Sequence, residues 1–256
     1  MNDAFVTGLG LWTPWHADLA AWRTGGRAPE PSAPRGLGLP PGVARRATPL
    51  ARLAADVLHQ ATTEAAVPAS EVAMVLGTVA GELGTTFDTL ALTTAEPPSS
   101  SPLRFRNAVH NAALGHLAIA HGNTGYASAL SADAERVVAM SLLEGLGWLQ
   151  EAGGHVAVLV VEEAWPGHDH PPLGAAVLLS EAPASGACVH GRLGDVCRAV
   201  PDLPAGAHDE ALAASPVRGV LDLLGALTGQ AQGRVRLSAP REDRTAWTAL
   251  FRPASS

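Results

Sequence analysis

The feature that most constrains the fold is one uninterrupted apolar segment, His155-Val-Ala-Val-Leu-Val-Val161. Its residues do not alternate between apolar and polar, as they do in a strand with one face in water. A strand of this kind is buried on both faces, which is the situation inside a sheet that carries helices on either side. The sequence therefore predicts an α/β fold built on a covered sheet.

Strand-like and helix-like segments alternate along the rest of the 256-residue chain. The pattern contains no linker and no second copy of itself, so we predict one domain over residues 1–256. Five strands are expected at 4–12, 72–77, 126–131, 155–161 and 174–179, and helices at 17–23, 46–66, 86–92, 105–121 and 133–152. Residues 182–256 are expected to form a C-terminal extension with strands near 188–192 and 234–237 and a helix over 209–227.

The charge balance argues against a nucleic-acid partner, because the net charge is −7 and no basic stripe interleaved with aromatic residues occurs. No segment approaches the roughly 18 uninterrupted apolar residues that span a membrane. The chain also opens without the charged and apolar regions of a signal peptide. We therefore expect a cytoplasmic protein. Cys188 and Cys197 are then expected to be reduced thiols, with a disulfide as the alternative.

Several short motifs follow one another in a characteristic order. None is specific alone, but together their order and spacing resemble the N-terminal half of a β-ketoacyl synthase. The motifs are Val6-Thr-Gly-Leu-Gly10 with Thr13-Pro14, Arg45-Arg46, Leu76-Gly77-Thr78, Ser101-Pro-Leu-Arg-Phe-Arg-Asn107, Ala108-Val-His-Asn-Ala112 and Gly122-Asn-Thr-Gly125.

Among β-ketoacyl synthases, the chain most resembles the short proteins that serve as chain-length factors in aryl-polyene and type II polyketide pathways. The resemblance covers residues 4–181. It implies a thiolase-like half-fold, with a five-stranded mixed sheet covered by helices. Only the first of the family's two pseudo-repeated halves is recognised, and the family's two decarboxylation-promoting histidines belong to the other half.

The junction between the strand at 126–131 and the helix after it has the place of the family's nucleophile elbow. Counting from Gly125, the family's cysteine falls at Ala134, give or take one residue. The elbow is vacant: it consists of Ser131, Ala132, Asp133, Ala134 and Glu135. The helix is expected to begin at Asp133, so that both carboxylates would be favoured by the helix dipole and would raise the pKa of a neighbouring thiol. We therefore expect no catalytic residue here.

The resemblance implies a non-catalytic subunit that pairs with a catalytic ketosynthase. That complex would perform decarboxylative condensation on acyl chains held by an acyl carrier protein, and no cofactor is implied beyond the carrier's phosphopantetheine arm. The strand before the elbow would form the interface, through Ala127, Ser128, Ala129 and Leu130, with a helix around His110 and Asn111 nearby. Phe87 and Leu90 are candidates for the wall of the tunnel that limits chain length.

Other functions remain open. Ser131 with His110 as base could make a serine-dependent acyltransferase or hydrolase, and a homodimeric scaffold of the same fold needs no condensation at all. His168-Asp-His170 has metal-ligating residue types, but no further ligands at a recognisable spacing, so we predict a surface loop and no metal. Gly8-Leu-Gly10 lacks the third glycine of a dinucleotide-binding turn. Glu162 and Glu163 are expected to be solvated charges at a strand end.

Overall fold

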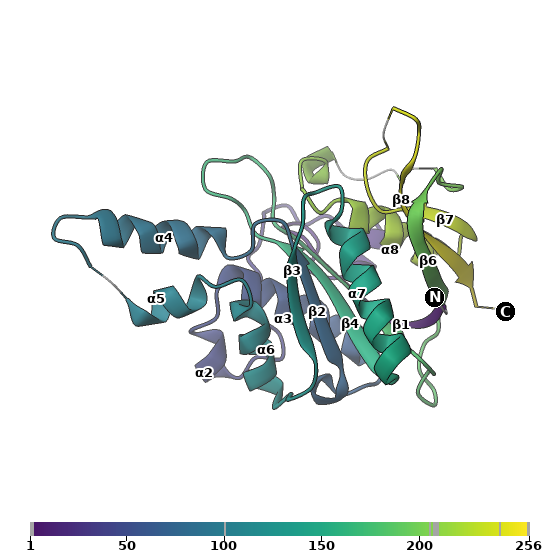
Figure 1. Cartoon of the computed structure of the whole chain (residues 1–256), viewed down its shortest axis with the longest axis horizontal. Helices are drawn as coiled ribbons and strands as arrows, with labels where there is room; N and C mark the ends of the chain where they lie inside the picture. Colours follow the sequence, from purple (N-terminus) through teal and green to yellow (C-terminus); the bar gives the residue numbers. More distant parts are fainter. Residues whose placement is uncertain (1–2, 100, 205, 207–209, 241, 255–256) are drawn as a thin grey trace.

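The computed structural model describes residues 3–99, 101–204, 206, 210–240 and 242–254, and a single mixed sheet runs through it (Figure 1). The sheet has eight strands in the order β3-β2-β4-β5-β1-β6-β8-β7. β3, β2 and β4 are parallel, and every other neighbouring pair is antiparallel. The strands are β1 (Ala4–Trp12), β2 (Ala73–Thr78), β3 (Ala127–Ser131), β4 (His155–Glu162), β5 (Leu173–Ser180), β6 (Gly191–Ala199), β7 (Gly233–Arg236) and β8 (Ala246–Pro253).

Helices cover both faces of this sheet. α3 and α6 pack on one face, and α7 and α8 pack on the other. The helices are α1 (Leu19–Arg23), α2 (Pro41–Ala44), α3 (Pro49–Glu64), α4 (Leu83–Thr94), α5 (Pro102–Asn107), α6 (Ala112–His121), α7 (Val137–Ala152) and α8 (Gly219–Gly229), with short 3₁₀ turns at Ala69–Glu71 and Glu210–Leu212. No helix among the described residues is long and apolar enough to cross a membrane.

β4 confirms the prediction from its apolar run, because its side chains enter two separate cores. Val156, Val158 and Val160 pack in the core under α7. The alternating residues Ala157, Leu159 and Val161 pack in the core under α3. Because both faces of this strand are buried, apolar side chains are favoured at every position, which explains why apolar and polar residues do not alternate.

The predicted strand number is wrong, because the C-terminal extension continues the sheet. The five expected strands correspond to β1 to β5. The extension adds three more strands by pairing β6 with the free edge of β1, where Ala4 lies opposite Leu193. The strand expected near 188–192 is β6, the helix expected over 209–227 is a 3₁₀ turn followed by α8, and β8 was not predicted. Asp209 lies outside the described residues.

The helix expected over 105–121 is broken into α5 and α6. Asn107, the last residue of α5, donates a side-chain hydrogen bond to the carbonyl of Arg46 (3.1 Å), which ties the end of α5 to the segment before α3. The chain then turns, and Asn111 becomes the residue that precedes α6. The apolar pattern had placed His110 and Asn111 within a helix, and the structure places them in the turn between α5 and α6.

The glycines of β1 allow α3 to lie directly on the strand. A Cβ atom on Gly8 would lie 2.0 Å from the carbonyl oxygen of Ala61, and one on Gly10 would lie 2.3 Å from that of Val57. No side chain fits at these distances. The Gly8-Leu-Gly10 motif thus serves close helix–strand packing and does not open a dinucleotide-binding turn.

Gly10→Ala is expected to destabilise the fold by about 3 kcal/mol, because the new methyl group must push α3 away from β1. Urea unfolding followed by far-UV circular dichroism measures this loss. Gly42→Ala is the matched control, since a Cβ atom there meets no atom of the described chain within 4 Å. A Gly10→Ala midpoint equal to that of the Gly42→Ala variant would contradict the packing argument.

Candidate functional site

The junction between β3 and α7 has the shape of an elbow and is held to the end of β2. The amide of Ala132 donates to the carbonyl of Thr78 (3.3 Å), and the Ser131 hydroxyl donates to the carbonyl of Val79 (2.6 Å). α7 itself begins only at Val137. The elbow residues Ser131 to Glu135 thus precede the helix, and Ala134, the position at which the resemblance places the family's cysteine, carries a methyl group.

The two acidic residues of the elbow are paired with arginines. Asp133 accepts hydrogen bonds from the Arg136 side chain (Nε–Oδ2 2.9 Å) and from its backbone amide (3.0 Å). The Arg136 guanidinium lowers the pKa of Asp133. Glu135 pairs with Arg198 of β6. The expectation that both carboxylates lie in the first turn of the helix is wrong, because Asp133 instead caps the turn that precedes the helix.

Ser131 and His110 do not form a hydrogen-bonded pair in this arrangement. The Ser131 hydroxyl is exposed and directs its proton to the Val79 carbonyl. His110 packs over the turn after β2, with its Nδ1 atom 3.4 Å from where a Cβ on Gly81 would lie. A general base takes a hydroxyl proton at a heavy-atom distance of about 2.6–3.2 Å, or through one water. The Ser131 hydroxyl is instead hydrogen-bonded to the backbone.

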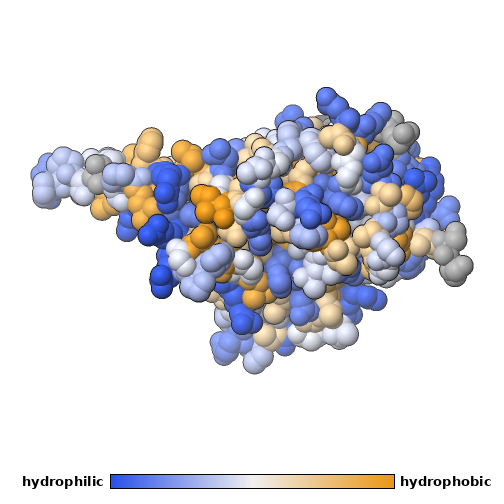
Figure 2. Space-filling view, turned by 90° about the horizontal axis from the view of Figure 1, so that it is seen from below, coloured by the Kyte–Doolittle hydropathy of each residue, from blue (hydrophilic) through white to orange (hydrophobic). Residues whose placement is uncertain are grey.

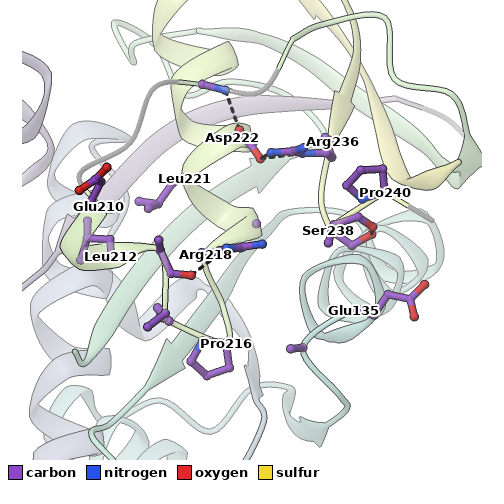
Figure 3. Close-up of a pocket in the computed structure, with 17 residues that line it drawn as sticks. Glu135, Glu210, Leu212, Pro216, Arg218, Leu221, Asp222, Arg236, Ser238 and Pro240 are labelled. Atoms are coloured by element: carbon purple, nitrogen blue, oxygen red, sulfur yellow. Dashed lines mark hydrogen bonds and ion pairs between the residues drawn. The ribbon is translucent and has the colours of Figure 1, made fainter. Parts of the chain in front are cut away.

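A cavity of about 760 Å³ lies between the elbow and the C-terminal extension (Figure 3). Ala134 and Glu135 line one side, and the extension supplies the rest of the wall. There Asp222 pairs with Arg236 (2.8 Å), while Arg218 donates to the carbonyl of Ala213 (2.8 Å). The described lining residues include neither cysteine nor histidine, so this wall offers no thiol and no imidazole.

β3 is an edge strand whose outer side is unpaired among the described strands. On its inner side, Tyr126 accepts a hydrogen bond from Met74 (2.9 Å), and Ala132 donates to Thr78. Because alternate residues of a parallel strand face the same neighbour, Ala127, Ala129 and Ser131 direct their amides and carbonyls outward. The segment carries no charge, proline or bulge, which are the usual devices that block an open edge.

An arm made of α4 and α5 projects from the body on the same side as β3 (Figure 1). Arg104 and Asp88 join the two helices through a pair 3.4 Å apart. Apolar surface lies along the arm and where it joins the body (Figure 2). The large exposed apolar residues of the arm are Phe87, Leu90, Leu103 and Phe105, and Val109 lies in the turn that follows it.

Phe87 and Leu90 lie on the arm and are 50% and 57% exposed. This chain alone therefore does not enclose them, and they can line a tunnel only where another chain covers the arm.

Three buried glutamates hold the root of the arm. Glu162 accepts hydrogen bonds from Thr78 Oγ1 (2.8 Å) and the amide of Val79 (2.6 Å), and Glu163 accepts one from the amide of Gly84 (2.7 Å). Glu82 accepts one from Thr48 Oγ1 (2.7 Å), while its second oxygen is buried without a partner among the described residues. Glu162 and Glu163 were expected to be solvated, and this is wrong because the start of α4 folds over them.

Burial raises the pKa of Glu82 to about 8 and that of Glu163 to about 7. The mutual repulsion of the two carboxylates adds to the rise at Glu82.

The sequence of residues 12–214 matches the family model of the β-ketoacyl synthase N-terminal domain. The chain belongs to this family. The matched region runs through the elbow and β6, and it ends beyond residue 181, where the motifs had placed the end of the resemblance. No curated protein matches the chain.

Solved ketosynthase structures share the fold of this β-ketoacyl synthase domain. A chain from the ketosynthase ApeO in complex with its chain length factor ApeC, from Xenorhabdus doucetiae, is 20% identical with TM-score 0.69, over 98% of this chain and 100% of that chain. The ishigamide ketosynthase/chain length factor is 17% identical with TM-score 0.63, over 78% of this chain and 68% of that chain. A β-ketoacyl synthase from Burkholderia phymatum STM815 is 14% identical with TM-score 0.60, over 89% of this chain and 69% of that chain.

The thiolase-like ketosynthase fold is therefore confirmed. The junction between β3 and α7, where the resemblance places the elbow, is a turn between a strand and a helix. The structure brings β3, the elbow and the turn that holds His110 to one side of the β-ketoacyl synthase domain, whereas Phe87 and Leu90 lie out on the arm. Sequence reasoning missed Glu82 and Arg198. Neither residue lies next to a pattern that would signal its role. For the burial of Glu162 and Glu163 a weak signal existed, because these adjacent glutamates directly follow the most apolar predicted strand.

The other candidate groups lie away from the elbow. Cys188 and Cys197 are free thiols, exposed and half-buried respectively. The rings of His168 and His170 pack edge-on against Trp165, with centroids 5.5 and 4.6 Å from it. These two histidines therefore pack around a tryptophan in the loop between β4 and β5.

Proposed function

We propose that this chain is a non-catalytic chain-length-factor subunit of a type II β-ketoacyl synthase complex. It pairs with a catalytic ketosynthase that condenses carrier-protein-bound acyl chains with loss of carbon dioxide. The observation that carries the proposal is the elbow. The family fold is kept around it, alanine stands at position 134, where the resemblance places the family's cysteine, and the flanking carboxylates pair with Arg136 and Arg198.

The electrostatics of the elbow support this proposal. In a condensing enzyme, the elbow must favour a thiolate, and a nearby cation or helix N-terminus does so. Here Asp133 caps the turn before α7 with a carboxylate. Each carboxylate that would repel a thiolate at this position is paired with an arginine, so the local charge is balanced and supplies no unpaired cation for a thiolate.

The open edge of β3 and the apolar arm support pairing with a second thiolase-like subunit. Main-chain groups along an unblocked edge are a template for another strand. Exposed side chains such as Phe87, Leu103 and Phe105 are the kind of surface that a partner covers. Covered in this way, Phe87 and Leu90 would wall the path of the growing acyl chain. The acyl group on the carrier protein's phosphopantetheine arm would then react in the partner's active site.

Affinity capture of the tagged chain from its native lysate tests the proposal. We expect a ketosynthase that retains its own active-site cysteine, recovered in a one-to-one ratio and identified by mass spectrometry. The complex should condense carrier-bound substrates, and the isolated chain should not. Condensation by the isolated chain would contradict the proposal.

Two further outcomes would replace it with another function. Recovery of the chain paired only with itself would favour the homodimeric scaffold, because the same edge and arm could pair with a second copy. Acyl or fluorophosphonate labelling that Ser131→Ala abolishes would favour the serine enzyme. We do not expect this labelling, since the Ser131 hydroxyl is hydrogen-bonded to the carbonyl of Val79 and not to a base.

A further inference from the structure

Three side chains with metal-ligating atoms meet where the C-terminal extension joins the body. Glu64 is the last residue of α3, and Cys188 and His190 lie in the segment that leads into β6. One ligand atom from each residue lies within 4.8 Å of the other two. Neither the elbow, the cavity nor the arm includes these residues.

The distances fit a single ion. His190 Nε2 lies 3.2 Å from Glu64 Oε1 and 3.7 Å from Cys188 Sγ. With bonds of about 2.0 Å to nitrogen and oxygen and about 2.3 Å to sulfur, the ligand atoms of a tetrahedral zinc centre are about 3.3 to 3.5 Å apart. Small side-chain rotations would bring all three atoms onto one ion.

The backbone around the three residues already holds two of them in place. The second oxygen of Glu64, Oε2, accepts a hydrogen bond from the amide of Leu9 (2.7 Å), which leaves Oε1 directed at His190. The His190 amide donates to Val6 (2.9 Å), and its carbonyl accepts from Ala254 (3.1 Å). Such outer partners orient metal ligands and raise affinity. Cys188 is exposed, which gives an ion a path from solvent.

We propose that Glu64, Cys188 and His190 bind a zinc ion that fastens the C-terminal extension to α3. Thiolate and imidazole donors select zinc over magnesium and calcium, which prefer oxygen ligands. Cys188 binds as the thiolate, and its proton is released to solvent. Three protein ligands leave the fourth tetrahedral position to water. The site joins the part of the chain that carries the elbow to the extension that forms the wall of the cavity.

Titration of the full chain with Zn²⁺ tests this site. The chain is stripped with a chelator, kept reduced, and titrated in competition with a chromophoric chelator. We expect one Zn²⁺ per chain, and we expect Cys188→Ser to weaken binding at least about 100-fold, the upper end of the effect of losing an outer partner. Co²⁺ in place of Zn²⁺ should give a thiolate-to-metal charge-transfer band that Cys188→Ser removes.

Two control variants and one stability measurement test whether the ion is held at Cys188 and not at the other thiol or the loop histidines. Cys197→Ser removes the other free thiol and should leave affinity, band and zinc-dependent stabilisation unchanged. His168→Ala should also have no effect, and a loss there would overturn the proposal in favour of the loop histidines. Zn²⁺ should raise the melting temperature of the wild-type chain but not of Cys188→Ser. Absence of binding, or equal binding by wild type and Cys188→Ser, would overturn it as well.

Discussion

Ala129→Pro is expected to weaken pairing of the chain with the proposed ketosynthase partner about 100-fold while leaving the fold intact. The Ala129 amide points away from β2, so proline removes no hydrogen bond from the sheet. Proline is tolerated at such outward positions of an edge strand. Proline has no backbone N–H, so position 129 can no longer donate a hydrogen bond to a partner strand. The proline ring also keeps the partner strand from approaching β3 closely. Losing two to three interchain hydrogen bonds corresponds to about 3 kcal/mol, or roughly 100-fold in Kd.

Isothermal titration with the ketosynthase measures this effect, and far-UV circular dichroism verifies the fold. Ala129→Ser keeps the amide and should bind as the wild type does. Ser128→Pro should instead unfold the edge, because the Ser128 amide faces β2. If Ala129→Pro binds its partner like the wild type, β3 is not the interface, whatever the function of the chain.

Glu82→Gln is expected to stabilise the protein increasingly as the pH rises from about 5 to 8. The Glu82 carboxyl is 2% exposed, faces Glu163 and has one oxygen without a partner in the described part of the chain, so its ionised form is disfavoured in the folded state. A glutamine keeps an acceptor for Thr48 and carries no charge.

The direction follows from the two states of Glu82. Below its ordinary pKa of 4.5, the carboxyl is protonated in both the folded and the unfolded chain, so no penalty exists. Between 4.5 and about 8, the unfolded chain loses a proton that the folded chain keeps, so stability falls with rising pH. The slope is about 1.4 kcal/mol per pH unit, which bounds the total at about 5 kcal/mol. Above about pH 8, the carboxyl is ionised in both states, and the stability difference between wild type and Glu82→Gln no longer changes with pH.

Urea unfolding of wild type and Glu82→Gln at pH 5, 6.5 and 8 isolates this contribution, because the other titrating groups cancel in the difference. Glu163→Gln should show the same trend over a narrower range, since the pKa of Glu163 is raised only to about 7. The exposed Glu71→Gln is the control and should show no trend. A difference between Glu82→Gln and wild type that does not change with pH would contradict burial of an ionisable carboxyl at the root of the arm.

Strands whose burial is visible in their own residues were predictable. β1 was expected over 4–12 and is observed at Ala4–Trp12, and β4 differs from its predicted range by one residue at its end. The break between α5 and α6 was not predictable, because the apolar pattern continues through it. Asn107 ends α5 by bonding to Arg46, a partner that only the fold brings near.

The elbow also combines features that the sequence predicted with contacts that only the fold creates. Its position and the absence of a cysteine follow from the order of motifs and from Ala134 itself. The pairing of Glu135 with Arg198 could not be foreseen, because Arg198 lies on a strand of the extension that the motifs did not reach. The same holds for Glu64, which is far along the chain from Cys188 and His190.

The sequence by itself determined the α/β class, the first five strands and the absence of a cysteine from residues 131–135, because these depend on the polarity and identity of residues close together in the chain. Only the tertiary structure decided that the extension joins the same sheet, that Glu82 and Glu163 are buried, and that the outer edge of β3 is open. Each of these depends on which distant segment covers a residue. Burial, pairing and desolvation are properties of such contacts, and no local pattern encodes them.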